Sequence, residues 1–174
     1  PNRNTFTPAL TAGTDPANFR ELPQTGNPYL VIRVNGTPIF CRGGNWGMDD
    51  AMKRCSREQL EPAFRLHRLS RFNMIRNWTG ESTEEAFYDL CDEYGMLVWN
   101  DFWMSTGKYN LMPLDYDLFC ANATDVVRRF RNHPSIAVWC PRNEGYGEGL
   151  DEDLHRIVLR EDGTRHYHGN SREV

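Results

Sequence analysis

The residues best suited to chemistry lie in five short segments that combine tryptophan, asparagine and acidic or basic side chains. These segments are Gly43–Trp46, Arg76–Trp78, Trp99–Trp103, Trp139–Glu144 and His168–Ser171. All five contain asparagine and four contain tryptophan. Indole rings stack on the apolar C–H faces of sugars, while asparagine, aspartate and arginine supply the hydrogen bonds that sugar hydroxyls need. The mixture therefore predicts a carbohydrate site.

A carboxyl group in such a setting can act as an acid and base on a glycosidic oxygen. Glu144 is the candidate, because it follows an apolar run that ends in Trp139. The Asn143–Glu144 dipeptide is common by chance, and only its position makes it informative. The predicted substrate-binding residues are Asn45, Trp46, Arg76, Trp78, Asp101, Trp103, Trp139 and Asn143.

These candidates also have purely structural interpretations. Trp99 and Trp139 each end an apolar run, so for either one alone we favour core packing over sugar stacking. Trp46, Trp78 and Trp103 lie beyond the predicted strands, and there we favour the site. An arginine directly after a strand can instead pair with a core carboxylate.

Short apolar strands alternate with helices along most of the chain, which is the pattern of parallel βα units. Strand centres are predicted near positions 39, 74, 98, 137 and 167, and helices over 56–71, 82–94, 117–131 and 150–160. Capping boxes at Ser56–Gln59 and Ser82–Glu85 are predicted to open the first two helices, and Gly95 to end the second. The first helix is expected to bury Leu60, Phe64, Leu66 and Leu69.

The beginning of the chain has a different character. Residues 1–28 are rich in Thr, Pro, Asn and Gly without a sustained period, which predicts a linker. Tyr29–Val34 and Thr37–Cys41 flank Asn35-Gly36, a strong hairpin signal, and the second of them is counted as the first strand of the parallel series. Residues 29–174 are predicted to form part of one domain.

Two folds share this alternation of strands and helices: an open doubly wound sheet and a (β/α)₈ barrel. A doubly wound nucleotide-binding sheet is disfavoured, because no glycine-rich phosphate loop follows any predicted strand. A complete barrel needs about 250 residues. We therefore predict an α/β fold containing about the first five strands of a TIM barrel, preceded by a short hairpin and linker.

Composition excludes several other classes of protein. The chain has 174 residues, a net charge of −4 and a mean hydropathy of −0.68. No apolar run approaches the ~18 residues of a membrane span, and Lys and Arg are too scattered for a nucleic-acid surface. Five cysteines without a CxxC pair indicate neither a disulfide framework nor a zinc site, and Cys91 and Cys140 are predicted to be buried thiols. No cofactor or metal is predicted; oligomeric state and compartment stay open, with a periplasmic or secreted location favoured for a bacterial source.

The same segments resemble family 2 glycoside hydrolases. The residues that carry the resemblance are Ile136–Trp139 with Asn143–Glu144, then Arg42–Trp46, Phe72–Arg76, Tyr94–Trp99 and Arg131–Ser135. The resemblance implies that Glu144 is the general acid/base, that Asn143 binds the hydroxyl at sugar C2, and that Arg76 supports the active-site carboxylates. It also implies hydrolysis with retention, a nucleophilic Glu from a seventh strand outside this chain, and a β-sandwich domain whose tail is formed by residues 1–28.

Departures from the wider family favour one substrate class. Asn77–Gly80 replaces the Ser-His-Tyr-Pro-like stretch of β-galactosidases and β-glucuronidases, and Trp99–Trp103 lacks their Asp-Glu pair. The chain looks more similar to β-mannosidases and exo-β-glucosaminidases, so a β-mannoside or β-glucosaminide is expected rather than a β-galactoside. This fragment alone is expected to be inactive. Two alternatives remain, a sugar-binding pseudoenzyme that lacks the nucleophile and a doubly wound domain for a small acidic ligand.

Overall fold

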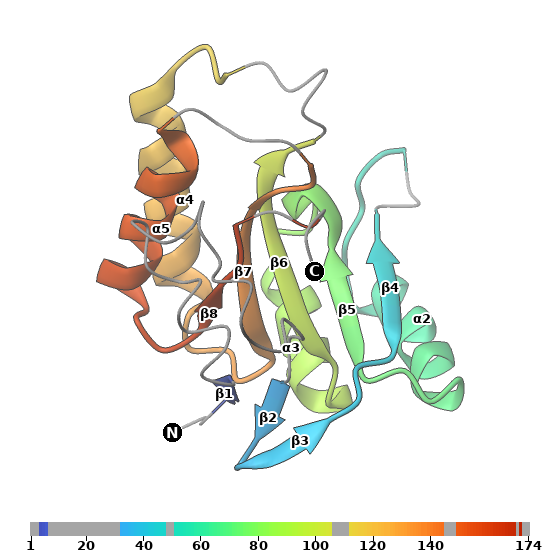
Figure 1. Ribbon diagram of the computed structural model, residues 1–174. Coiled ribbons are helices and arrows are strands. Elements are labelled where there is room, and N and C mark those ends of the chain that lie inside the picture. Colours follow the sequence, from blue (N-terminus) through green and yellow to red (C-terminus); the bar gives the residue numbers. More distant parts are fainter. Residues whose placement is uncertain are drawn as a thin grey trace.

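The computed structural model describes residues 4–6, 32–47, 51–105, 112–144, 149–169 and 171. Two separate sheets are present (Figure 1). The antiparallel sheet has the order β1-β2-β3, formed by Asn4–Phe6, Ile32–Val34 and Thr37–Ile39. The parallel sheet has the order β4-β5-β6-β7-β8, formed by Gly43–Trp46, Met74–Asn77, Leu97–Met104, Ile136–Arg142 and His166–Tyr167.

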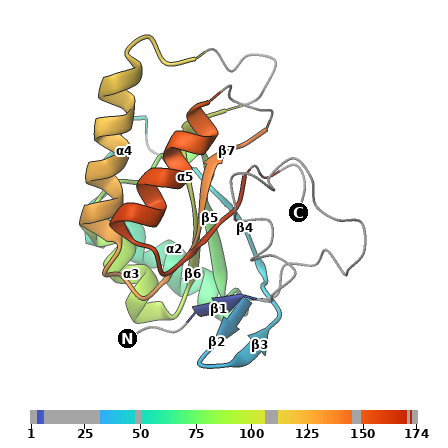
Figure 2. The same ribbon diagram turned by 60° about the vertical axis from the view of Figure 1, so that its left-hand side comes forward.

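Helices connect the successive parallel strands: α2 (Arg57–Leu69), α3 (Glu85–Tyr94), α4 (Tyr116–Phe130) and α5 (Leu150–Glu161). Figures 1 and 2 show them on one side of the sheet. The strand order follows the chain without reversal, whereas a doubly wound sheet reverses direction at a switch point. The predicted α/β fold with about five strands of a barrel is therefore confirmed. Within the described part of the chain, no helix has the length and apolar content needed to cross a membrane.

The hairpin is confirmed, but the predicted first barrel strand was wrong. Asn35 and Gly36 form the turn between β2 and β3 with positive φ angles of 51° and 82°. β3 belongs to the antiparallel sheet, and the parallel series begins at β4, which the sequence pattern placed in a loop. Two of the four residues of β4 are glycine, which is depleted in strands, so pairing with β5 rather than local propensity forms this strand.

A large apolar core fills the space between the helices and the sheet. Its fully buried aromatic members include Phe64 of α2, Phe87 of α3 and Phe130 of α4. Each such side chain contributes about 1.5–3 kcal/mol by burial. Leu66 and Leu69, expected in this core, are 64% and 77% exposed. At 100° per residue, they project from the side of α2 opposite to Phe64.

Neither capping box forms as predicted. Ser56 is the N-cap of α2, but its side chain makes no capping hydrogen bond. The N-cap of α3 is Glu84, two residues after Ser82. The backbone N–H of Ser82 instead donates to Oδ1 of Asn77, which ties the loop to the end of β5. Gly95 does end α3 in the left-handed conformation, as expected.

A smaller apolar cluster lies on the other face of the parallel sheet. It joins Trp99 of β6 and Ala137, Val138 and Cys140 of β7 to Ile32 of β2. The antiparallel sheet lies below the parallel strands in Figure 1, at their amino-terminal ends. Ile32 therefore covers the apolar face at that end. Cys140 and Cys91 are both buried, as predicted.

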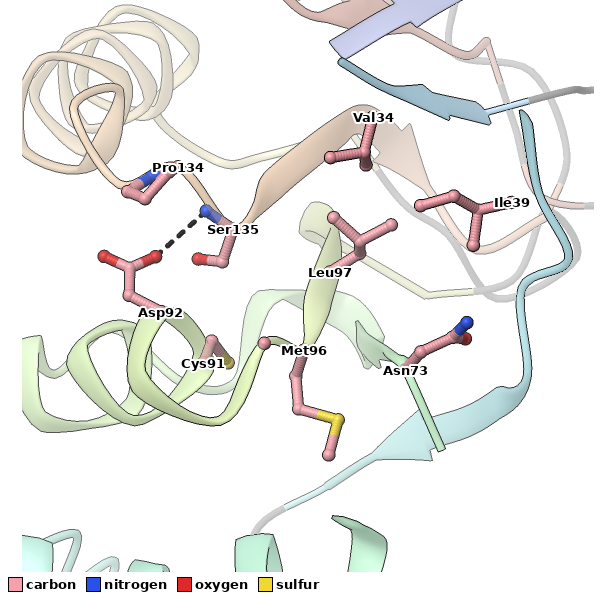
Figure 3. A pocket seen from close by; sticks show the side chains of 10 residues that line it. Val34, Ile39, Asn73, Cys91, Asp92, Met96, Leu97, Pro134 and Ser135 are labelled. Carbon is pink, nitrogen blue, oxygen red and sulfur yellow. Dashed lines mark hydrogen bonds between the residues drawn. The ribbon is translucent and has the colours of Figure 1, made fainter. Parts of the chain in front are cut away.

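A cavity of about 270 Å³ lies at the same amino-terminal end. Figure 3 shows Val34 and Ile39 of the hairpin facing Leu97 across it, and Met96 also belongs to its lining. The lining is mainly apolar. Asp92 accepts a hydrogen bond of 2.9 Å from the backbone N–H of Ser135 at its edge. Active sites of βα barrels lie at the opposite, carboxyl-terminal end, so this cavity is not the candidate active site.

Candidate active site

A polar cluster joins the carboxyl-terminal ends of three neighbouring strands, β5, β6 and β7. Arg76 of β5 donates from Nε and Nη2 to the two carboxylate oxygens of Asp101 on β6, at 3.2 and 2.6 Å. The same Nη2 donates to Oδ1 of Asn143, directly after β7, at 3.0 Å. The guanidinium of Arg76 therefore connects two residues that lie 25 and 67 positions after it in the chain.

Asp101 is the most enclosed member of this polar cluster, with a side chain that is 0% exposed. Oδ1 also accepts from Nε1 of Trp99 at 3.0 Å, and Oδ2 from the backbone N–H of Thr79 at 3.0 Å. Burial raises the pKa of Asp101, and the hydrogen bonds from Arg76, Thr79 and Trp99 act against that shift. All four hydrogen bonds are donated to the carboxylate, so they favour its charged form.

Asn143 is held through both its side chain and its backbone. Its Oδ1 accepts from Nε1 of Trp78 at 3.2 Å, in addition to the bond from Arg76. Its backbone N–H donates to the carbonyl of Met104 at 3.0 Å, and its carbonyl accepts from the N–H of Ser171 at 3.1 Å. The residue is thus fixed between the end of β6 and the segment after β8.

Glu144 continues the same path beyond β7. Its backbone N–H donates to the carbonyl of Ser105 at 3.0 Å, so the peptide is anchored to the end of β6. The residue is exposed at the carboxyl-terminal edge of the sheet. The structure therefore places Glu144 next to Asn143 and presents it toward solvent at the end where a barrel carries its chemistry.

Strand alternation explains which polar residues meet. Successive side chains of a strand point to opposite faces, so Arg76 and Asn77 separate. Asn77 turns to the helix side, where its Nδ2 donates to Oδ1 of Asn100 at 2.9 Å, and Tyr88 of α3 donates to the same oxygen at 2.7 Å. Asn45 of β4 is in register with Arg76 and is exposed on the same face as the polar cluster.

Three of the predicted sugar-binding tryptophans face the helices instead. Trp139 is 0% exposed, stacks on Phe102 at 5.8 Å and donates from Nε1 to Asp162 at 2.8 Å. The ring centroids of Trp46 and Phe64 are 5.3 Å apart, and those of Trp103 and Phe119 of α4 are also 5.3 Å apart. The side chains of these three tryptophans do not join the polar cluster, because they occupy strand positions whose outward face packs on helices.

Two members of the polar cluster were missed from the sequence. Trp99 lies two residues before Asp101, and that spacing alone could have placed both on one face. Thr79 has φ 48° and ψ 25°, a left-handed conformation that is rare for a β-branched residue. No sequence signal indicates this strained conformation. The hydrogen bond from the backbone N–H of Thr79 to Asp101 stabilises it.

Arg142 also faces away from the polar cluster. Its side chain is 1% exposed, and its Nε donates to Oδ1 of Asp151 in α5 at 2.8 Å. Tyr167 of β8 donates to the backbone carbonyl of Asp151 at 2.6 Å. These bonds hold the start of α5 against β7 and β8. Within the described ranges, no group of three or more His, Cys, Asp or Glu side chains could hold a metal ion.

Comparisons with known proteins agree with the fold and with the sequence motifs. The family model described as "Glycosyl hydrolases family 2, TIM barrel domain" matches residues 30–174. The mannosylglycoprotein endo-beta-mannosidase of Lilium longiflorum is 40% identical over 66% of this chain and 13% of its own length. Beta-mannosidase B of Thermothelomyces thermophilus is 39% identical over 79% of this chain and 17% of its own length.

A solved structure shows the same relationship. Beta-D-mannosidase from Dictyoglomus thermophilum superimposes with a TM-score of 0.73 and 30% identity, over 81% of this chain and 20% of that one. The chain thus spans between 13% and 20% of the length of these three relatives. The family and the β-mannosidase-like branch predicted from the sequence are confirmed.

Proposed function

The chain belongs to family 2 of the glycosyl hydrolases, as part of their TIM barrel domain, and we propose that with the remaining barrel strands it forms a retaining β-glycoside hydrolase. The observation that carries the proposal is the placement of Asn143 and Glu144. They follow β7 directly, and Asn143 is bound to Arg76 and Trp78 at the end of β5. This arrangement gives a carboxyl group beside a preorganised set of hydrogen-bonding groups.

In the proposed mechanism, Glu144 first protonates the leaving glycosidic oxygen and then activates a water molecule. A second carboxylate from the rest of the barrel attacks the anomeric carbon and forms a glycosyl-enzyme. Retention requires the two carboxyl groups to be about 5–5.5 Å apart. The anchoring of the Glu144 peptide to Ser105 supports this role, because it fixes the base of the side chain relative to the sheet.

Binding of the sugar is assigned to groups on the face of the sheet that carries the polar cluster. Asn143 binds the hydroxyl at C2, and exposed Asn45 is available to a second hydroxyl. Arg76 is already paired with Asp101, so it orients Asn143 rather than carrying a charge to the substrate. Trp46, Trp103 and Trp139 are left out of the proposed sugar-binding surface because they pack against helices.

The proposed substrate is a β-mannoside, with a β-glucosaminide second and a β-galactoside less favoured. The relatives support the first place of the β-mannoside, since both of those compared in sequence are named as β-mannosidases. The segment Asn77–Gly80, which differs from the corresponding stretch of β-galactosidases and β-glucuronidases, gives a local reason for this preference. It contains Trp78, whose indole N–H donates a hydrogen bond to Asn143. The proposed partner of the protein is therefore an oligosaccharide or glycoside.

The test is hydrolysis of aryl β-mannoside, β-glucosaminide and β-galactoside by the full-length protein and its Glu144→Gln variant. We expect one substrate to be cleaved, and the variant to lose deglycosylation, with azide restoring turnover as a β-glycosyl azide. Glu58→Gln, on the exposed face of α2, is the matched control and should behave as the parent.

Two results would contradict the proposal. Equal rates for Glu144→Gln and the parent would show that Glu144 is not the acid/base. Sugar binding by the parent without turnover of any substrate would instead support the pseudoenzyme alternative.

A further inference from the structure

The orientation of the Asn143 side-chain amide is determined by two hydrogen-bond donors, Arg76 and Trp78. Arg76 and Trp78 both point N–H groups at the same amide atom, at 3.0 and 3.2 Å. Guanidinium and indole groups donate hydrogen bonds and cannot accept them. The atom that faces them must therefore be the oxygen, and the NH₂ group must point the other way.

The NH₂ group of Asn143 is then left for a ligand. Among the residues that the structure describes, none accepts a hydrogen bond from Nδ2 of Asn143. An NH₂ group can donate to an acceptor oxygen, such as a sugar hydroxyl. If the amide were turned over, its oxygen would face the ligand and its NH₂ would oppose two other donors.

The backbone next to Trp78 is fixed by a hydrogen bond to the polar cluster. The next residue, Thr79, is in a left-handed conformation with φ 48°, and its N–H donates to Oδ2 of Asp101. The strained backbone is therefore attached to the same carboxylate that binds Arg76. Arg76 divides its Nη2 between Asp101 at 2.6 Å and Asn143 at 3.0 Å, whereas the indole N–H of Trp78 is directed at Asn143.

We propose that Trp78 is a positioning residue, whose indole N–H holds the amide of Asn143 with its NH₂ group toward the substrate. Hydrolysis would then depend on the hydroxyl at C2 of the sugar, which accepts a hydrogen bond from that NH₂ group. Trp78 acts through Asn143 rather than by stacking on the sugar. The inference rests on the proposed hydrolase function and adds a source of specificity to it.

The experiment compares the full-length parent with Trp78→Phe, which keeps an aromatic ring and removes the N–H donor. Two aryl glycosides are used, the preferred one and its 2-deoxy analogue. Because one neutral hydrogen bond is lost, we expect kcat/KM for the hydroxylated substrate to fall about 2- to 10-fold. The value for the 2-deoxy analogue should stay within about twofold, since it has no oxygen for Asn143 to bind.

Two further variants separate positioning from a general structural effect. Trp103→Phe removes an indole that packs on Phe119 outside the polar cluster, and it should leave the ratio between the two substrates unchanged. In an Asn143→Ala background, Trp78→Phe should have no additional effect on that ratio, because the group that it positions is gone.

The outcomes distinguish the two proposals. Equal losses for both substrates, or an unchanged ratio, in Trp78→Phe would overturn the role of Trp78 while leaving the hydrolase function intact. A persisting effect of Trp78→Phe in the Asn143→Ala background would also overturn it. A parent without turnover of any glycoside would overturn the proposed function and, with it, this inference.

Discussion

Replacing Asp101 by Asn should loosen the part of the sheet that carries the polar cluster. Each carboxylate oxygen of Asp101 accepts two hydrogen bonds: Oδ1 from Arg76 and Trp99, Oδ2 from Arg76 and Thr79. An amide has only one oxygen, so whichever way the new side chain turns, two donors face an NH₂ group. The substitution also removes the negative charge that compensates Arg76, which is 17% exposed.

The expected magnitude follows from those losses. A buried donor left without an acceptor costs about 1–3 kcal/mol, and breaking a buried ion pair costs about 3–5 kcal/mol. Because Arg76 keeps some contact with water, we take the low end, about 3 kcal/mol. Such a change corresponds to a decrease of roughly 100-fold in the protection of amides that exchange through opening of β5 and β6.

Hydrogen–deuterium exchange of the full-length protein, followed by mass spectrometry of peptides from β5 and β6, measures this decrease. Asp115→Asn is the matched control, since Asp115 is an exposed N-cap of α4 and asparagine caps equally well. An Arg76→Met/Asp101→Asn double variant should lose less protection than the two single changes together. Protection in Asp101→Asn within threefold of the parent would refute the reasoning.

Three other changes test the surrounding structure. Burial lowers the pKa of His166 to about 3, so the contribution of the neutral imidazole to stability is complete above the unfolded pKa and is lost as the pH falls below that value. Urea unfolding should therefore show a free energy of unfolding that is about 2–3 kcal/mol lower at pH 4.5 than at pH 6.5. The His166→Gln variant should show a smaller decrease. Arg142→Met removes the buried cation beside Asp151 and should cost about 3–5 kcal/mol by the same exchange assay. Gly80→Ala should cost more than about 1 kcal/mol, because φ is 63° and the new Cβ would lie 2.5 Å from a β6 carbonyl oxygen, whereas Gly44→Ala, with open space, should be nearly neutral.

Several features of the fold were predictable because they depend on local patterns. The hairpin at Asn35-Gly36 follows from the left-handed conformations that these two residues tolerate. The end of α3 at Gly95 has the same cause. The alternation of apolar strands with amphipathic helices predicted a parallel sheet, since each helix must return the chain to the same edge.

The first barrel strand was not predictable on that basis. Gly43 and Gly44 have little preference for a strand, and β4 exists because its backbone pairs with β5 some 30 residues later. Thr37–Ile39 has a clearer strand pattern, yet it pairs in the hairpin instead. Strand pairing over long separations therefore outweighed local propensity at this point.

The sequence by itself determined the family, the alternation of strands and helices that follows β4, and the meeting of Arg76, Asp101 and Asn143 at the ends of their strands. Only the tertiary structure decided which tryptophans accompany them. Irregularities in the pairing of β6 with β7, between Val98 and Trp99 and between Asp101 and Met104, shift the alternation of side chains.

Trp103 and Trp139 consequently pack against helices, whereas Trp99, two residues before Asp101, lies in the polar cluster by ordinary strand alternation. The direction of the Asn143 amide likewise depends on donors 65 and 67 positions earlier in the chain. The residue type determines which interactions a side chain can make. Strand register and bulges determine the face of the sheet to which it points, because a shift of one residue moves a side chain to the opposite face.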